Sequence, residues 1–179
     1  MTQKAVLIVG AGSGLSASLA RAFNSKGMKI VLAARNIDKL DSLKKEIDAL
    51  VFKCDSTENK SVQNLFLQTD SIIGTPEIVI YNPSLRSVKP FIDYDPDEML
   101  QSITVNSYGA FLVAHESVKR MLKIGKGNIF FTGSSASVKG FAKSASFDMG
   151  KFGLRGLAQS LARELHPQNI HIGHFVIDG

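Results

Sequence analysis

A chain of 179 residues with 44% hydrophobic residues is long and apolar enough for one domain over residues 1–179, which excludes a disordered protein. Its single cysteine, Cys54, excludes an internal disulfide, and no apolar run reaches the roughly 18 residues that a membrane span needs. The net charge of +5 comes from lysines interleaved with acids, which favours a solvated surface. We therefore expect a cytoplasmic protein with no nucleic-acid and no membrane partner.

Short apolar runs alternate with segments of helical periodicity along the chain. The runs are rich in Val and Ile, which predicts strands buried on both faces. Each helical segment has one apolar face, and the last, over about residues 144–165, ends before Pro167. The alternation predicts an α/β fold, a doubly wound parallel sheet with helices on both faces. The expected strands are 5–9, 29–35, 50–54, 77–82, 128–133 and 169–177.

The first expected strand continues into a glycine-rich sequence, VGAGSGLSASLA, at residues 9–20. A glycine turn between a buried strand and an amphipathic helix lets the backbone approach a pyrophosphate, and the helix N-terminus supplies N–H groups and a positive dipole end. This context favours a dinucleotide site over a purely structural turn. The residues expected in this site are Gly10, Gly12, Ser13, Gly14 and Leu15.

The second expected strand ends in Ala-Ala-Arg, so Arg35 stands where an acid would bind the ribose 2′-hydroxyl of NAD. A basic residue there favours the 2′-phosphate of NADP(H). The alternative is that Arg35 is only a solvated strand end. The absence of an acid predicts NADP(H) as the preferred cofactor, with NAD(H) still possible.

The sequence DPDE at residues 95–98 predicts the start of a long helix. Asp95 is a favourable N-cap, and Pro96 suits the first turn. Glu98 is placed to complete a capping box with the backbone of Asp95.

Taken in order, several motifs resemble the short-chain dehydrogenase/reductase superfamily over nearly the whole chain. The glycine loop resembles T-G-x-x-x-G-x-G, with Val9 in place of the threonine and Ser16 in place of the last glycine. Asn82 matches one asparagine of N-N-A-G, and the two residues that follow depart from it. The other matching stretches are CDS (54–56), VNSYGAF (105–111), FFTGSSA (130–136) and the helix FDMGKFGLRGLAQSLAREL (147–165).

The resemblance implies a Rossmann-like fold and a set of site residues. Asp55 would contact the adenine, and Ser56 and Asn82 would also line the cofactor site. Lys151 would hold the nicotinamide ribose and supply a positive charge, unless it is a solvated helix residue. The implied reaction is hydride transfer between NADP(H) and a carbonyl or secondary alcohol.

The remaining implied catalytic residues come from two motifs. Asn106 would order a water in a proton relay, although a hydrogen bond to backbone is the structural alternative. Ser134 would orient the substrate carbonyl, because it lies thirteen residues before position 147, a spacing common in the family. Ser135 is the alternative for this role.

Phe147 stands where the resemblance places the family's catalytic tyrosine. A phenol near an ammonium group has a lowered pKa and can protonate the developing oxyanion, whereas phenylalanine has no proton to give. Two hypotheses follow. The chain is an oxidoreductase whose proton comes from Ser134, a water or another group, such as Tyr81, Tyr94 or Tyr108; or it is a catalytically impaired dinucleotide-binding protein, a sensor or an oligomer partner.

Other features complete the expectations. The chain ends at VIDG, without the family's C-terminal lid and last strand, so either the sequence is truncated or the site is open. Apolar helix faces predict a homodimer or homotetramer. His171 and His174 are expected on opposite strand faces, which disfavours a shared metal, and Cys54 is expected in the core. A methyltransferase that binds S-adenosylmethionine is the remaining alternative, against which Asn106 and Lys151 argue.

Overall fold

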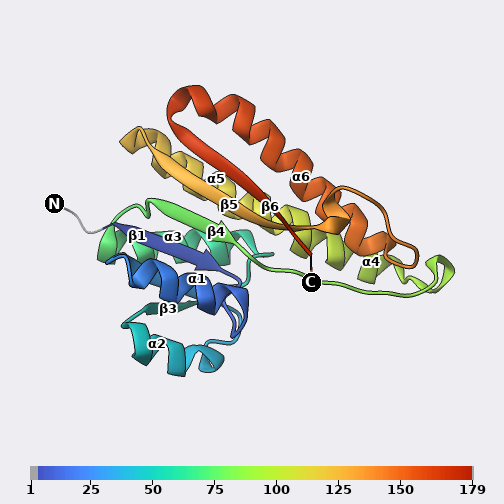
Figure 1. Ribbon diagram of the computed structural model, residues 1–179, viewed down its shortest axis with the longest axis horizontal. Helices are drawn as coiled ribbons and strands as arrows, with labels where there is room; N and C mark the ends of the chain where they lie inside the picture. Colours follow the sequence, from blue (N-terminus) through green and yellow to red (C-terminus); the bar gives the residue numbers. More distant parts are fainter. Residues whose placement is uncertain (1–3, 179) are drawn as a thin grey trace.

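The computed structural model describes residues 4–178 of the chain, and Figure 1 shows one sheet with helices against it. The apolar runs form the strands at nearly the expected positions, with ends that differ by at most one residue. The strands are β1 (Ala5–Val9), β2 (Lys29–Ala34), β3 (Leu50–Lys53), β4 (Ile78–Tyr81), β5 (Gly127–Ser134) and β6 (Ile170–Ile177).

The six strands pair in the order β3-β2-β1-β4-β5-β6, and every pair is parallel. The predicted α/β fold with a doubly wound, Rossmann-like parallel sheet is therefore confirmed. The strand order reverses direction between β1 and β4, where ligands of open α/β sheets bind beyond the carboxyl ends of the strands.

Helices cover both faces of the sheet (Figure 1). On one face, Val6 and Ile8 pack with apolar side chains of α1 and α2. On the other face, Leu7 and Val79 pack with α3, α5 and α6. The longer helices are α1 (Leu15–Asn24), α2 (Asp41–Ile47), α3 (Asn59–Ile73), α4 (Pro96–Ile103), α5 (Gly109–Ile124) and α6 (Ala145–Leu165), and the short ones are η1 (Asp38–Leu40), η2 (Phe91–Asp93), η3 (Thr104–Tyr108), η4 (Ser135–Ser137) and η5 (His166–Gln168).

The expected long helix after residue 95 consists of α4, η3 and α5, which follow one another without a break. Asp95 caps it as predicted, because its side chain accepts the N–H of Asp97. The predicted capping box is wrong: the Glu98 carboxylate forms an ion pair with Lys89 instead. The η3 segment is a turn of π-helix, a local widening that is frequent at functional sites.

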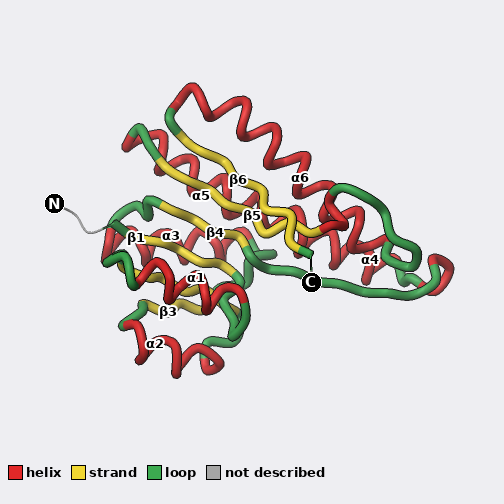
Figure 2. The backbone as a smooth tube through the Cα atoms, in the orientation of Figure 1, coloured by secondary structure: helices red, strands yellow, loops and turns green. Residues whose placement is uncertain are grey.

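The connection between β4 and α4 spans residues 82–95. Figure 2 shows it as a loop that runs away from the sheet to the far end of α4. The one hydrogen of the Tyr94 hydroxyl is shared between the backbone oxygens of Ser87 and Lys143, each at 3.0 Å, and the Lys89 N–H donates to Lys143 as well. These bonds tie the connection to the segment before α6.

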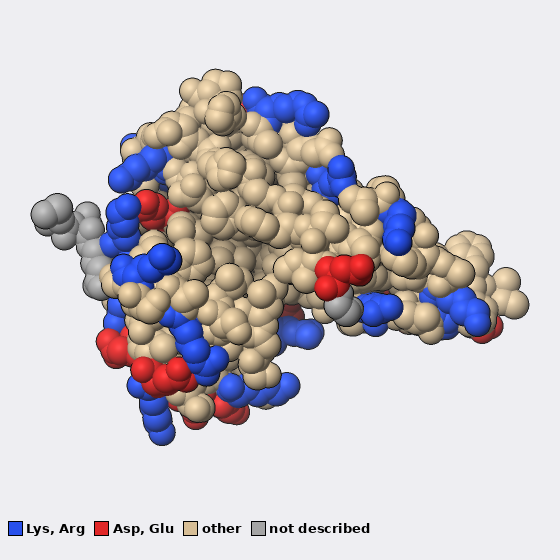
Figure 3. Space-filling model, in the orientation of Figure 1, with Lys and Arg blue, Asp and Glu red and all other residues tan. Residues whose placement is uncertain are grey.

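The structure also bears on the expectations for surface charge, membrane-spanning helices, the cysteine and two of the histidines. Figure 3 shows basic side chains dispersed over the visible face rather than gathered in a stripe, and acids lie among them. No helix within residues 4–178 is long and apolar enough to cross a membrane. Cys54 is buried, and burial raises the pKa of its thiol. His171 contacts Phe130, whereas His174 lies beside Gly133 on the other face of β5.

Candidate functional site

Two cavities lie at the carboxyl ends of the strands. The first, here called the β1–β3 cavity, has a volume of about 410 Å³ and is lined by residues that follow β1, β2, β3 and β4. The second, the β5–β6 cavity, has a volume of about 540 Å³ and is lined by the ends of β5 and β6 and the start of α6. Asn82 and Ser84 line both, so the cavities meet at the end of β4.

The β1–β3 cavity gathers only part of the predicted cofactor site. Gly10, Arg35, Asp55, Ser56 and Asn82 line it, as the sequence predicts. Val9 and Ala11 line it as well, but residues 12–15 of the glycine loop line neither cavity, and the Gly12 N–H already donates to the hydroxyl of Ser16. The predicted residues outside the cavity are Gly12, Ser13, Gly14 and Leu15.

Gly10 has a clear structural requirement. Its φ of +78° lies in the left-handed region, and a β-carbon there would clash with Pro83. The Asn82 side-chain amide donates to the Gly10 carbonyl at 3.2 Å, and the Asn82 backbone N–H donates to Val9. Gly10 therefore lets the segment after β4 pass directly against the end of β1, which is how the two cavities come to share Asn82.

The Asp55 carboxylate lies just beyond the end of β3 and accepts two hydrogen bonds. The backbone N–H and the hydroxyl of Thr57 both donate to its Oδ1, at 2.9 and 2.6 Å. Burial alone would raise the pKa of Asp55, but these bonds hold it below its ordinary value. The other oxygen, Oδ2, has no hydrogen-bond partner within residues 4–178, so it can accept from a ligand in the cavity.

The rim of the β1–β3 cavity is basic. Arg35 and Lys39 both line it, both are exposed, and neither forms an ion pair with another described residue. The sequence reasoning missed Lys39 and Asn36, which also lines the cavity. The signal was the short spacing of RNIDK, in which Lys39 follows Arg35 by four residues and lies in the short helix η1.

The β5–β6 cavity contains most of the predicted catalytic residues. Ser134, Ser135, Phe147 and Lys151 line it, together with the shared Asn82. The sequence predicted these residues but missed others on the same walls. Those missed include Ser84, Arg86, Val88, Thr132, Phe141 and Asp178.

Lys151 is the most deeply buried charged residue of this cavity, at 2% exposed. Its Nζ donates to the Thr132 carbonyl at 3.0 Å and forms no ion pair with another described residue. Burial lowers its pKa to about 8. Lys151 is therefore charged at neutral pH and becomes neutral at moderately alkaline pH. Because its side chain is buried, the alternative that it is a solvated helix residue is wrong.

Phe147 forms an aromatic wall beside this lysine. Its ring is 8% exposed, and the Lys151 Nζ lies 5.5 Å from the ring centroid, one helical turn away on α6. The guanidinium carbon of Arg86 lies 5.9 Å from the same centroid. The Phe147 ring thus has two cations near it, both within the range of cation–π attraction.

Ser134 and Ser135 differ in what their hydroxyls do. The Ser134 Oγ accepts the backbone N–H of Ala136 at 3.0 Å, as the N-cap of η4. An oxygen that accepts can still donate its own hydrogen into the cavity. The Ser135 hydroxyl donates to the Asp178 carboxylate at 2.9 Å, so its hydrogen is already committed.

Asn106 is fully buried and lines neither cavity. Its amide nitrogen donates to the carbonyls of Leu85 and Ser102, at 2.8 and 2.9 Å, and its oxygen accepts the Leu85 N–H at 3.3 Å. These are the backbone bonds that the structural alternative describes. Asn106 fastens the β4–α4 connection to the π-helical turn, and its predicted role in a water relay stays a prediction.

None of the three tyrosines, all of which are described, lines the β5–β6 cavity. The Tyr81 hydroxyl donates to the Val105 carbonyl at 2.5 Å, and burial raises its pKa far above the ordinary value. Tyr94 bonds backbone oxygens, and Tyr108 of η3 stacks on Phe111 of α5 at the surface. In this arrangement no phenol can deliver a proton beside Lys151.

Similar proteins cover nearly the whole chain. An uncharacterized oxidoreductase from Thermotoga maritima is 27% identical over 176 residues, covering 94% of this chain and 68% of the relative. A 3-oxoacyl-(acyl-carrier-protein) reductase from Bos taurus is 23% identical, covering 94% and 72%. A short-chain dehydrogenase structure from Rhodopseudomonas palustris has a TM-score of 0.93 at 32% identity, covering 98% of this chain and 85% of that one. Sorbitol-6-phosphate 2-dehydrogenase from Erwinia amylovora has a TM-score of 0.92 at 27% identity, covering 96% and 70%.

The sequence also matches a family as a whole. The match is to the short chain dehydrogenase family and spans residues 4–176. The strand order and the two cavities at the carboxyl ends of the strands are the architecture in which such a family binds a dinucleotide. The chain belongs to the short-chain dehydrogenase family of oxidoreductases.

Proposed function

We propose that this chain is an NADP(H)-dependent oxidoreductase that interconverts a carbonyl compound and a secondary alcohol. The observation that carries the proposal is the buried Lys151 beside Ser134 in the β5–β6 cavity, which meets a second, basic-rimmed cavity at Asn82. A dinucleotide that spans both cavities fits this arrangement. Family membership implies NAD(P) as the cofactor, and the 2′-phosphate preference is the finer part of the proposal.

The described residues fit the two ends of such a cofactor. Asp55 Oδ2 is available to accept from the amino group of an adenine, and Arg35 and Lys39 offer unpaired cations to a ribose phosphate. Lys151 offers a buried cation near the other end. When bound, NADPH supplies the hydride.

The residues of the chain then have distinct tasks. Ser134 orients the carbonyl oxygen through its hydroxyl hydrogen, and the positive charge of Lys151 stabilises negative charge that develops on that oxygen. Phe147, in the proposed position of the family's tyrosine, closes the pocket wall without donating a proton. The proton then comes from a water in the cavity, either directly or through Ser134, whose hydroxyl regains a proton from that water.

We expect Arg35→Ala to weaken NADPH binding about tenfold, because it removes a charged hydrogen bond to the 2′-phosphate. NADH has no such phosphate, so its affinity serves as the internal control. Calorimetric titration of both nucleotides against the parent and the variant measures this difference. Equal losses for both nucleotides, or no loss at all, contradict the proposed preference.

The pKa of Lys151 predicts a pH dependence. Since burial lowers this pKa to about 8, the ammonium group is charged below that pH and becomes neutral above it. We expect NADPH affinity to fall about tenfold as the pH rises from about 7 to 9. Lys151→Met should bind NADPH more weakly and with a flat profile over the same range. A parent profile that stays flat argues against Lys151 as a cofactor ligand.

Two alternatives have specific outcomes. A protein that binds NADPH but turns over no carbonyl in a broad screen, read by NADPH oxidation, is a dinucleotide-binding sensor or oligomer partner. Binding of S-adenosylmethionine but not of either nucleotide would favour a methyltransferase.

We also propose a homodimer or homotetramer, because Phe111 on α5 and Met149 on α6 are 45% and 54% exposed. Sedimentation measures the oligomeric state directly.

A further inference from the structure

The charge of the β5–β6 cavity is unbalanced. Three charged side chains of the described residues line it: Arg86, Lys151 and Asp178. The Asp178 carboxylate lies at the end of β6, where it accepts the hydrogen bond from Ser135. Neither cation of the cavity forms an ion pair with another described residue. The cavity therefore presents more positive charge than its own acid neutralises.

Arg86 differs from the other cation on the same connection. Lys89 is paired with Glu98, whereas the guanidinium of Arg86 has no carboxylate and no hydrogen-bond acceptor within residues 4–178. Its recorded contact is the ring of Phe147 at 5.9 Å, near the limit of a cation–π attraction. The planar guanidinium thus has its hydrogen-bond donors available to a ligand in the cavity.

The backbone on both sides of Arg86 is anchored. Asn106 bonds both the N–H and the carbonyl of Leu85, and the Tyr94 hydroxyl bonds the carbonyl of Ser87. A cation on a loop held at both neighbouring residues is positioned before a ligand arrives, which reduces the ordering cost of binding. This gives Asn106 a task outside the chemical step.

The Phe147 ring lies near both Arg86 and Lys151 in the β5–β6 cavity. Lys151 Nζ lies 5.5 Å from the ring centroid, and Ser134 lines the same cavity. Arg86 lies beside the same ring. Ser134, Phe147 and Arg86 all line one cavity, so a small molecule whose carbonyl meets Ser134 can extend along the Phe147 ring to reach Arg86.

We propose that Arg86 is a specificity-determining residue that binds a carboxylate or phosphate group on a small carbonyl substrate. The guanidinium fork matches either oxoanion with two parallel hydrogen bonds. The proposal rests on the oxidoreductase function proposed above and narrows its substrates to anionic carbonyl compounds.

The test measures binding without turnover, so that it remains informative if the protein reduces nothing. Protein saturated with NADP⁺, and protein without nucleotide, are titrated calorimetrically with levulinate and with methyl levulinate. A second pair, dihydroxyacetone phosphate and dihydroxyacetone, distinguishes a phosphate from a carboxylate. We expect one anion to bind about 10- to 100-fold more tightly than its neutral partner.

Arg86→Gln should reduce that ratio by about tenfold or more. The matched control is Lys139→Gln, since Lys139 lies over the Phe141 ring near the cavity but does not line it. Its ratio should change by less than about threefold, as for a screened surface charge. Circular dichroism and thermal melting check that each variant is folded.

Each result of these titrations either supports or overturns the role proposed for Arg86. Preference for either anion, lost in Arg86→Gln and kept in Lys139→Gln, supports the proposal and assigns the oxoanion. Equal binding of charged and neutral partners by the parent overturns it. An unchanged ratio in Arg86→Gln, or an equal loss in both variants, also overturns it, because the effect would then be diffuse. Anion binding without any carbonyl turnover leaves Arg86 as a ligand site and rejects the proposed reaction instead.

Discussion

Phe147→Tyr should raise kcat for reduction of a small ketone by about 10²- to 10⁴-fold and leave the Kd for NADPH nearly constant. The substitution places a phenol on a ring whose centroid lies 5.5 Å from Lys151 Nζ. A cation at this range lowers the pKa of the phenol and lets it protonate the developing oxyanion. The gain corresponds to about 3–5 kcal/mol of activation free energy. Stopped-flow measurement of NADPH oxidation gives kcat, and calorimetry gives Kd.

Phe152→Tyr is the matched control, because Phe152 lies on the same helix but lines neither cavity. It should change neither constant. If Phe147→Tyr leaves a measurable rate unchanged while Ser134→Ala abolishes it, the proton arrives by another route and the protein is a rewired enzyme. If the parent and Phe147→Tyr both bind NADPH but reduce no ketone, the non-catalytic hypothesis becomes the better account.

The predictable part of this protein is the part that local patterns determine. Short apolar runs rich in Val and Ile, such as residues 5–9, are typical of strands in a sheet covered on both faces, so strand positions follow from the sequence. The spacing of Phe147 and Lys151 places both on one face of a helix, and both line the same cavity. Ser134 lines it too, because it ends the strand beside that helix.

The unpredictable part depends on how loops fold over the site. Arg86 lies on a connection with no periodicity, so nothing in its neighbourhood of the sequence shows that it faces Phe147. Lys39 reaches the first cavity only through the short turn of η1. The sequence predicts a capping box for Glu98, but its carboxylate pairs instead with Lys89 on the β4–α4 connection.

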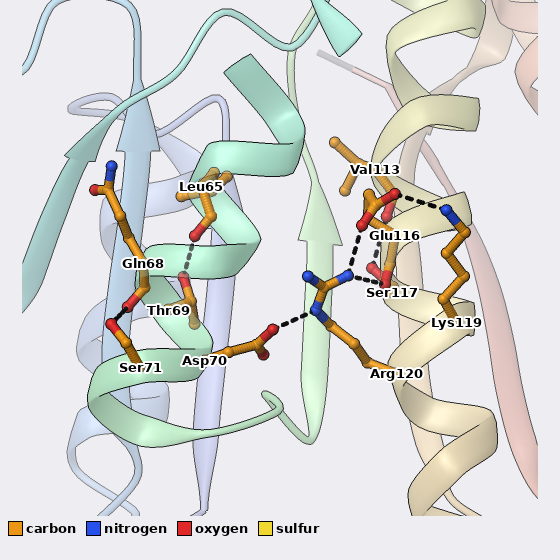
Figure 4. Close-up of polar contacts among 10 residues, drawn as sticks. All are labelled: Leu65, Gln68, Thr69, Asp70, Ser71, Val113, Glu116, Ser117, Lys119 and Arg120. Atoms are coloured by element: carbon orange, nitrogen blue, oxygen red, sulfur yellow. Dashed lines mark hydrogen bonds and ion pairs between the residues drawn. The ribbon is translucent and has the colours of Figure 1, made fainter. Parts of the chain in front are cut away.

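An ion pair between two helices escapes sequence reasoning for the same reason. Arg120 on α5 pairs with Asp70 on α3, in a network that also includes Glu116 and Lys119 of α5 (Figure 4). Arg120 donates from Nε to Asp70 and from Nη1 to the Glu116 carboxylate, both at 2.6 Å. Its guanidinium also lies 4.9 Å from the centroid of the Phe66 ring. Lys119 forms a second ion pair with Glu116, at 3.1 Å. The side chains of Arg120 and Glu116 are 14% and 8% exposed, so solvent screens this pair weakly.

Arg120→Met should lower the free energy of unfolding by about 3 kcal/mol at neutral pH. Methionine can still cover Phe66, so the loss comes mainly from leaving Glu116 without its closest cation. For a chain of this size the melting temperature should fall by about 10 °C. Arg21→Met is the matched control, since the Arg21–Glu46 pair joins side chains that are 49% and 45% exposed. It should cost less than about 1 kcal/mol.

Measuring the free energy of unfolding at acidic pH distinguishes the charge contribution of Arg120 from its packing contribution. Burial alone would raise the pKa of Glu116, but Arg120 and Lys119 hold it below its ordinary value of 4.5. A carboxyl whose pKa is lower in the folded state stabilises the fold above its ordinary pKa, and this contribution disappears as the pH falls through the folded value. The difference between parent and Arg120→Met should therefore be largest near pH 7 and shrink below about pH 4. Urea unfolding at both pH values measures it, and a difference that stays constant would show that Arg120 acts through its contact with Phe66 instead.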